Sequence, residues 1–450
     1  MKLDFKDLEI KIPKEDPFKY DKLNRETNAR ILENIFSKFS NGVVISLNSE
    51  WGTGKTTFIK MFSQYLNNKG YTILNFNAWQ TDFSDDPIYP LLAEFNERHP
   101  LSEKITNNLG RIFLAGGMEL LKGFITKFTG MDAKAFKAAL DEAQKIGSEA
   151  LKDYLNCKGS LENFKEALKE YVNQNYFNNP NNPRPIIFFI DELDRCNPFY
   201  AVKVLERIKH CFCIPGIIFC LSVDEEQLKN SIKGYYNSDS INAEEYLRRF
   251  IDFEFNLPKP DFIAYCNYLT DKFELNHIFL MDGYRNIEPI NEIICSAAYT
   301  LNLSLRQLEK LYGHIFIMCS SYPSRSSLLY LIFFTVIRKF FKNLYRQIEH
   351  KDLTILEFYK KISIIYPNDF NDDKCYFIGQ IVGLYGRMLG EISNNNTINE
   401  DIVSQLTQND DAYQQILSGI NVIVKDNTLN RPDLRNILEQ INLVSKINRS

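Results

Sequence analysis

Two short stretches of the sequence carry residue types that could bind a nucleoside triphosphate. The first is Ser49-Glu50-Trp51-Gly52-Thr53-Gly54-Lys55-Thr56-Thr57. A triphosphate needs backbone N–H groups that point inward, a cation for its β and γ oxygens, and a hydroxyl ligand for magnesium. Gly52 and Gly54 permit a close approach of the backbone, Lys55 supplies the charge and Thr56 supplies the hydroxyl. This stretch therefore predicts a loop that binds a nucleotide together with Mg²⁺.

The loop departs from the general pattern G-x-x-x-x-G-K-[ST] at one position. Ser49 occupies the place of the first glycine, so the pattern is met only from Gly54 onward. An ordinary strand-to-helix turn, capped by a serine or threonine, is the alternative interpretation. We expect Thr57 on the helix surface or near the α phosphate. Trp51 and Trp79 could each stack or pack, and packing in the core is the safer interpretation.

The second stretch is the hydrophobic run 185–191, which ends in the adjacent acids Asp191 and Glu192. In a nucleotide site, one such acid would hold magnesium and the other would act on the attacking water. A solvated strand end is the common alternative for any pair of acids. Because the acids accompany Lys55 and Thr56, we interpret the two stretches together as one nucleotide site.

The elements that must position these residues follow from the hydrophobic pattern. Five apolar runs predict strands, and a helical pattern covers residues 55–68. Four of the runs are continuously apolar, which is typical of parallel strands buried on both faces. We therefore predict an α/β fold with a parallel, doubly wound sheet. The predicted strands span residues 42–48, 71–79, 185–191, 216–224 and 251–257.

Length and pattern also predict how the chain is divided. Its 450 residues correspond to two or three domains at roughly 150 residues each. We assign residues 1–260 to a nucleotide-binding core with a helical insertion at about 93–182. We assign residues 261–450 to a helical lid and an all-helical C-terminal domain.

Composition excludes several classes of protein. Apolar residues make up 44% and charged residues 24%, which excludes wholesale disorder, collagen-like repeats and coiled-coil rods. The 53 Lys and Arg residues against 57 Asp and Glu leave no overall positive charge that would attract nucleic acid. The chain begins without the apolar segment of a signal peptide, and its nine cysteines are scattered like reduced thiols. We therefore expect a cytoplasmic location.

Four segments of the sequence match a known family pattern when they are taken together. The segments are Trp51-Gly52-x-Gly54-Lys55-Thr56, Phe76-Asn77-Ala78-Trp79, Asp191-Glu192-Leu193-Asp194-Arg195-Cys196 and Ser222-Val223-Asp224. Together they resemble the KAP family of P-loop NTPases. The likeness covers roughly residues 17–320 and implies a P-loop NTPase core with ATP and Mg²⁺ as ligands.

The resemblance implies roles for the residues of both phosphate motifs. Lys55 would grip the β and γ phosphates, while Thr56 and Asp191 would hold magnesium. Glu192 would polarise the lytic water, at a position where the family more often has a second aspartate. The loop residues Glu50, Trp51, Gly52, Thr53, Gly54 and Thr57 would surround the phosphates.

The resemblance also implies roles outside these motifs. Asp194 could position the water or pair with a basic residue. Four arginines could stabilise transition-state charge or sense the nucleotide, although a solvated salt bridge is the commoner role of an arginine. They are Arg195, Arg248, Arg249 and Arg306. Asp224 has the place of a γ-phosphate sensor. The segment 21–25 would line adenine, or simply pack.

Family members often carry transmembrane helices between the two phosphate motifs, and this chain departs from that pattern. Within residues 111–129, Glu119, Lys122 and Lys127 interrupt every apolar run, so a spanning helix would bury several charges. We therefore expect no transmembrane segment. An amphipathic contact of residues 114–128 with a membrane surface is the alternative.

Three functions are compatible with the sequence. The first is an ATP-driven conformational or assembly switch that works as a homo-oligomer or with a separately encoded partner protein, for which the resemblance suggests bacterial antiphage defence. The second is a DNA-associated ATPase motor or clamp, supported by the basic residues of 338–346. The third is a scaffold that binds nucleotide but barely hydrolyses it.

Overall fold

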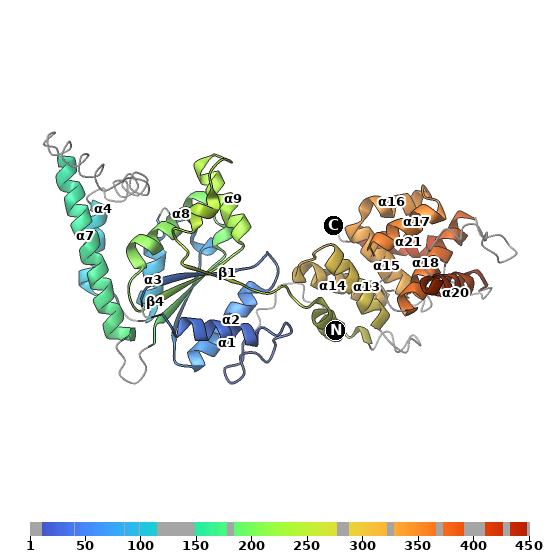
Figure 1. The fold of residues 1–450 in the computed structure, drawn as a ribbon, viewed down its shortest axis with the longest axis horizontal. Helices are drawn as coiled ribbons and strands as arrows, with labels where there is room; N and C mark the ends of the chain where they lie inside the picture. Colours follow the sequence, from blue (N-terminus) through green and yellow to red (C-terminus); the bar gives the residue numbers. More distant parts are fainter. Residues whose placement is uncertain are drawn as a thin grey trace. The chain divides into compact units, whose positions relative to one another are not determined.

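The computed structural model describes two compact units, one within residues 9–259 and the other from Pro260 onward. Both are drawn in Figure 1. The segment 115–148 lies outside the described residues, and it includes nearly all of the stretch 114–128 that we considered for a contact with a membrane surface. The described residues are 11–39, 41–84, 86–98, 100–114, 149–177, 184–276, 288–321, 328–365, 372–390, 410–425 and 433–447.

A five-stranded parallel sheet forms the centre of the first unit, with the strand order β2-β3-β4-β1-β5. The prediction of a parallel α/β fold is confirmed. The second predicted strand was too long, because Trp79 lies in a short 3₁₀ helix, η1 (Trp79–Thr81). The strands are β1 (Val43–Asn48), β2 (Thr72–Asn77), β3 (Ile186–Asp191), β4 (Ile217–Val223) and β5 (Phe253–Asn256).

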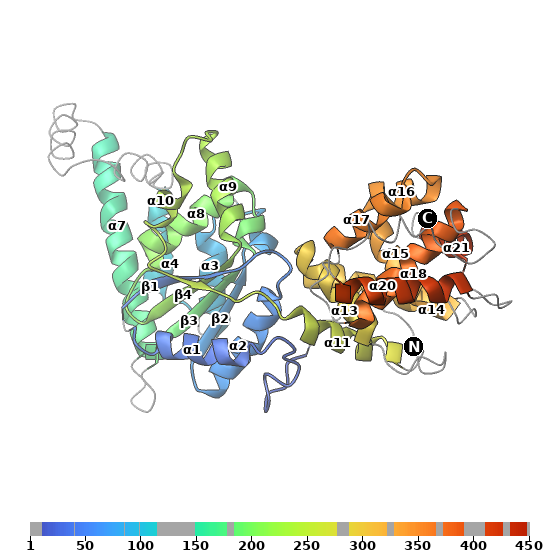
Figure 2. The ribbon, with the colours of Figure 1, turned by 45° about the vertical axis from the view of Figure 1, so that its right-hand side comes forward.

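Helices cover both faces of this sheet, since a parallel strand pair needs a crossover connection. On one face, α1 (Glu26–Phe36) and α2 (Lys55–Asn68) pack against the sheet, where the rings of Phe62 and Phe189 lie 5.8 Å apart. The other face packs against helices that include α3 (Ile88–Arg98), α8 (Pro198–Arg207) and α9 (Glu225–Tyr236). Figure 2 shows the two helical layers on opposite sides of the strands. The doubly wound arrangement is therefore present.

Two helices that pack against each other follow α3 along the chain. Helix α4 (Glu103–Leu114) runs beside α7 (Glu149–Val172), and Lys104 pairs with Glu170 at 2.9 Å. The remaining short helices of the unit are η2 (Asn173–Phe177), η3 (Leu193–Arg195), η4 (Ile208–Phe212) and α10 (Ala243–Leu247).

Every element described in the second unit is a helix. None of the described helices in the chain is both long enough and apolar enough to cross a membrane. The helices are α11 (Phe262–Lys272), α13 (Glu288–Thr300), α14 (Leu305–Ser321), α15 (Leu328–Phe340), α16 (Lys342–His350), α17 (Ile355–Ile365), α18 (Asp372–Leu389), α20 (Asp410–Lys425) and α21 (Leu434–Ile447).

The strand register places polar residues side by side at the carboxyl edge of the sheet. Asn77, the last residue of β2, pairs with Asp191, which in turn pairs with Ser222 of β4. Asn48 ends β1 between Val223 and Asn256 on the neighbouring strands. In open α/β sheets, ligands bind outside this edge.

Candidate functional site

The loop between β1 and α2 is folded around its own polar groups. Gly52 and Gly54 have φ angles of 78° and 90°, a region that other residues rarely adopt. The Ser49 hydroxyl lies 2.7 Å from the Thr53 hydroxyl, and the Ser49 N–H donates to the Val223 carbonyl at 3.1 Å. Serine in place of the first glycine is thus accommodated, because its hydroxyl bonds within the loop.

Lys55 is the first residue of α2, and its side chain is buried beneath the loop. Its ammonium donates to the carbonyl of Ser49 and, at 3.1 Å, to that of Glu50. Burial lowers the pKa of Lys55, although the carboxylates of Asp194, Asp224 and Asp191 act in the opposite direction. A cation is therefore held where a phosphate chain would lie across the loop.

Asp191 joins the loop to the sheet edge. One of its oxygens, Oδ2, accepts a hydrogen bond from the Thr56 hydroxyl at 2.8 Å, and the other accepts one from the Ser222 hydroxyl at 2.8 Å. Burial raises the pKa of Asp191, while the bonds from Ser222 and Thr56 oppose the shift. A divalent cation would favour the ionised carboxylate. A hydroxyl and a carboxylate are the hard oxygen ligands that Mg²⁺ prefers, so Thr56 and Asp191 fit this ion.

Glu192 directly follows Asp191 and has a left-handed backbone, with a φ of 61°. Its oxygens are both engaged, one by the Asn77 amide at 2.9 Å and the other by the Arg195 guanidinium at 2.9 Å. Arg195 also lies over the ring of Trp79, 5.8 Å from its centroid. The carboxylate expected to polarise water is thus held by two neighbours.

Asp194 is buried behind the loop, with 6% of its surface exposed. Its Oδ2 accepts hydrogen bonds from the indole N–H of Trp51 and, at 2.9 Å, from the backbone N–H of Asp224. No basic residue bonds to Asp194 within the described part of the chain. Asp224, the predicted γ-phosphate sensor, accepts from the Trp51 backbone N–H at 3.2 Å and caps α9 through Gln227 at 3.4 Å.

The prediction that both tryptophans are core residues is wrong. Trp51 is 47% exposed and Trp79 is 51% exposed. Each is fixed by a polar contact instead: Trp51 by its bond to Asp194 and Trp79 by the Arg195 guanidinium.

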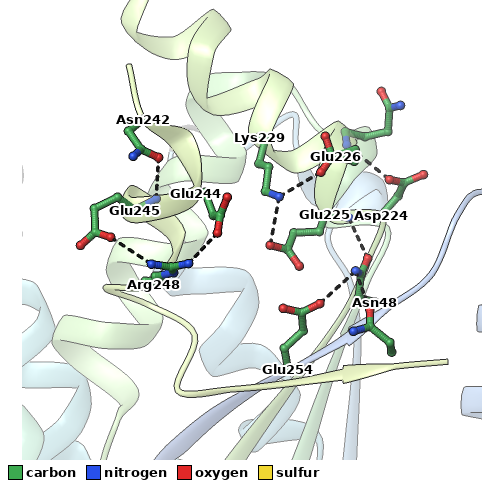
Figure 3. Close-up of polar contacts among 12 residues, drawn as sticks. Asn48, Asp224, Glu225, Glu226, Lys229, Asn242, Glu244, Glu245, Arg248 and Glu254 are labelled. Atoms are coloured by element: carbon green, nitrogen blue, oxygen red, sulfur yellow. Dashed lines mark hydrogen bonds and ion pairs between the residues drawn. The ribbon is translucent and has the colours of Figure 1, made fainter. Parts of the chain in front are cut away.

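Asn48 fixes the end of β1 just before the loop, as Figure 3 shows. Its side chain accepts from the Glu225 backbone N–H at 3.0 Å and donates to Asn256 at 2.9 Å and Glu254 at 3.3 Å. Asn48, Asn77 and Ser222 were missed as site residues. A polar residue at the end of an apolar strand was the signal that could have found them.

The other predicted residues lie at the margins of the site or outside the first unit. Glu50 is exposed and pairs with Lys259 at 3.6 Å, and Thr57 lies half-buried in the first turn of α2. Arg25, in the segment expected near adenine, is buried and donates to the Pro258 carbonyl at 2.6 Å. Arg306 lies near the start of α14 in the second unit, so its role stays a prediction.

A comparison with protein families decides the identity. Residues 25–321 match the KAP family P-loop domain. The chain belongs to the KAP family. Lys55, Thr56 and Asp191 are thus residues of a KAP P-loop domain, and the predicted resemblance is confirmed.

Two solved structures are similar to this KAP protein at low sequence identity. C. elegans PCH-2 has 14% identity and a TM-score of 0.33, over 73% of both chains. The ORC2 protein of Aeropyrum pernix, in ADPNP–ADP complexes, has 13% identity and a TM-score of 0.29, over 94% of both chains. Curated proteins gave no match.

Proposed function

We propose that this KAP-family chain is a magnesium-dependent ATPase that acts in the cytoplasm as a conformational or assembly switch. It works as a homo-oligomer or with a separately encoded partner protein, in bacterial defence against phage. Nucleotide binding and the P-loop fold follow from family membership. Hydrolysis, the choice of ATP and the cellular role are our inference.

One observation carries the proposal. Thr56, at the start of the helix that follows the loop, contacts Asp191, at the end of a strand that is 135 residues away in sequence. The Lys55 ammonium lies under the same loop. A helix start, a cation, a hydroxyl and a carboxylate are therefore gathered at one edge of a parallel sheet, where a Mg²⁺–triphosphate needs them.

Each residue of the site would have a separate role in nucleotide binding and hydrolysis. The N–H groups of the loop and the Lys55 ammonium bind the phosphates, and the oxygens of Thr56 and Asp191 hold the metal. When bound, the metal neutralises charge on the β and γ oxygens. Glu192 takes the proton of the attacking water or orients it, once its carboxylate is free to do so.

The hydrogen bond from Asn77 and the ion pair with Arg195 hold Glu192 in place, and they favour a second candidate function. This is a nucleotide-loaded scaffold with slow turnover. Both oxygens of the Glu192 carboxylate already contact a neighbouring side chain, so only part of its roughly four acceptor sites remains for water. In this case the bound ATP itself would be the signal, and hydrolysis would only reset it.

The structure gives less support to a DNA motor. Within the basic stretch 338–346, Arg338 bonds to Asn442 and lies 5.3 Å from the ring centre of Tyr345, while Lys339 bonds to His314 at 3.0 Å. These two cations are engaged in helix packing.

Purification, nucleotide extraction and turnover measurements test the proposal. We expect ATP or ADP in the extract, and Mg²⁺-dependent ATP hydrolysis that Lys55→Ala abolishes without unfolding the protein. A protein that neither retains nor binds any nucleotide would contradict it. Steeply salt-sensitive stimulation by DNA would favour the motor instead.

The antiphage role has its own test. Bacteria that express the wild-type chain with its neighbouring genes should resist phage in a plaque assay, and Lys55→Ala should remove the resistance. Equal plaque counts with and without the wild-type chain, over a broad phage panel, would contradict the role.

A further inference from the structure

Trp51 of the phosphate loop is bonded at two points to acids that follow other strands of the sheet. Its indole N–H donates to Oδ2 of Asp194, beyond the end of β3. Its backbone N–H donates to Oδ2 of Asp224, beyond the end of β4, at 3.2 Å. The Asp224 N–H in turn donates to the same oxygen of Asp194 at 2.9 Å, so the three residues form a closed set of contacts.

Burial and charge show which part of this set matters. Asp194 is 6% exposed, and a buried carboxylate is costly unless donors satisfy it. Its two described donors are the N–H groups of Trp51 and Asp224. Hydrogen bonds to a carboxylate are about twice as strong as neutral ones. Trp51 is 47% exposed, so the burial of its ring does not account for its position.

We propose that Trp51 and Asp194 form a latch that holds the phosphate loop in its nucleotide-binding conformation before the nucleotide arrives. Asp194 is then a positioning residue and not a catalytic one, and Trp51 is the part of the loop on which it acts. This inference rests on the proposed function for its consequences, although the latch itself is a property of the nucleotide-free protein.

The latch has a definite kinetic signature. When the loop is already ordered, nucleotide binding no longer includes the free-energy cost of ordering the loop. The latch therefore increases the affinity for nucleotide. It acts equally on bound substrate and transition state, and its loss therefore raises KM while kcat stays the same. An Asp194 that oriented the lytic water would act in the transition state, and its loss would lower kcat.

The contact can be tested without any nucleotide, because the chain has only two tryptophans. In ¹⁵N-tryptophan-labelled protein, NMR should show two indole N–H resonances, which Trp51→Phe and Trp79→Phe assign by deletion. We expect the Trp51 proton to exchange with solvent more slowly than that of Trp79, and Asp194→Asn to shift the Trp51 resonance alone. An unmoved Trp51 resonance in Asp194→Asn would overturn the latch.

A double-mutant cycle tests its role in binding. Trp51→Phe keeps the ring and removes the donor, and Asp194→Ala removes the acceptor. Each should raise the Kd for a fluorescent ATP analogue by roughly tenfold, with kcat of ATP hydrolysis changed by less than about twofold. The Kd of the double variant should be no higher than that of the single variant that binds more weakly. The Kd of Asp194→Asn, which keeps an acceptor oxygen, should lie between those of the wild type and Asp194→Ala.

Additive effects on Kd, or a lower kcat at unchanged KM, would overturn the proposal. Thermal unfolding of each variant shows that it is folded. A wild-type protein that binds no ATP would refute the proposed function, and the NMR measurement would still decide whether the latch exists.

Discussion

Glu192 is the side chain on which turnover depends in this account. Replacing it with glutamine keeps the size and the contact with Asn77 but removes the base, so hydrolysis should fall by about 100-fold or more. ATP binding should be retained, because Glu192 does not belong to the phosphate loop. Turnover and binding of radiolabelled ATP check both outcomes.

The matched control for this variant is Glu226→Gln. Glu226 is an exposed glutamate that pairs with Lys229 on α9, at 2.9 Å. Its replacement should leave both quantities unchanged. Full turnover in Glu192→Gln would show that another group activates the water.

Lys339 should make stability depend on pH. Burial and the nearby Lys310 lower its pKa from 10.5 to about 8 in the folded protein, where it also bonds to His314. Between these two pKa values the unfolded chain binds the proton that the folded one has lost. The contribution of Lys339 to stability therefore rises with pH from about 8 to 10.5.

Thermal unfolding between pH 7 and pH 10 checks this, with Lys339→Met compared against the wild type. We expect the methionine variant to be the more stable protein near pH 7 and to lose that advantage as the pH rises. Lys342→Met, at an exposed position, should change neither the stability near pH 7 nor its dependence on pH. A constant difference between Lys339→Met and the wild type would contradict the assignment.

The residues of the site differ in how far the sequence alone could reveal them. Lys55, Thr56 and Asp191 belong to short local patterns, and each pattern alone predicts the chemistry of its residues. Asn77 and Ser222 meet Asp191 only through the register of three strands, which is a non-local property. The indole bond of Trp51 depends on a partner 143 residues away.

Among the elements, the strands were the most predictable part. The continuous apolar runs of β1, β3 and β4 reflect burial on both faces, which few other structures require. The end of β2 was less certain because Trp79 continues the apolar pattern. The chain leaves the sheet there, at a 3₁₀ turn that begins after Ala78.

A buried ion pair joins α8 to the segment just before α3, on one face of the sheet. Arg207, at the end of α8 and 1% exposed, donates to Asp86 through Nη2 at 2.8 Å and through Nε at 3.1 Å and 3.2 Å. Asp86 also accepts the backbone N–H of Ile88, at the start of α3.

Breaking this pair on one side should be costly. Arg207→Met leaves the Asp86 carboxylate buried without its counter-charge, and we expect a loss of about 3–5 kcal/mol in unfolding free energy. Urea denaturation measures the loss. The double variant Asp86→Asn/Arg207→Met should recover part of it, because no charge remains buried. A loss below about 1 kcal/mol in Arg207→Met would show that the pair is unimportant.

At the scale of the molecule, the helical second unit is held together partly by close contacts between glycines of one helix and the backbone of the facing helix. A Cβ atom on Gly379 of α18 would lie 2.1 Å from the Ile416 carbonyl oxygen of α20, and one on Gly419 would lie 2.0 Å from that of Tyr376. Gly379→Ala must therefore separate the two helices, and we expect a loss of about 1–3 kcal/mol in the stability of this unit.

Gly159 of α7 provides the control, since an added Cβ there meets no atom within 4 Å. Gly159→Ala should be neutral or should stabilise the first unit by up to about 1 kcal/mol. Calorimetric unfolding of both variants checks the contrast. Equal melting behaviour of Gly379→Ala and the wild type would contradict the close packing of α18 and α20.

Composition and charge define the class of the molecule but identify no partner. A near balance of 53 basic and 57 acidic residues is compatible with many surfaces, and the sequence has no motif that names a partner. Partner choice depends on surface shape, which single-residue patterns do not encode.

The most direct measurement for the whole account is calorimetric titration of ATP into the wild type and Asp191→Asn, with and without Mg²⁺. The account predicts that Mg²⁺ tightens ATP binding to the wild type by about tenfold or more, and that Asp191→Asn loses this gain while it still binds metal-free ATP through Lys55. An equal gain from Mg²⁺ in both proteins, or no ATP binding by the wild type, would contradict it.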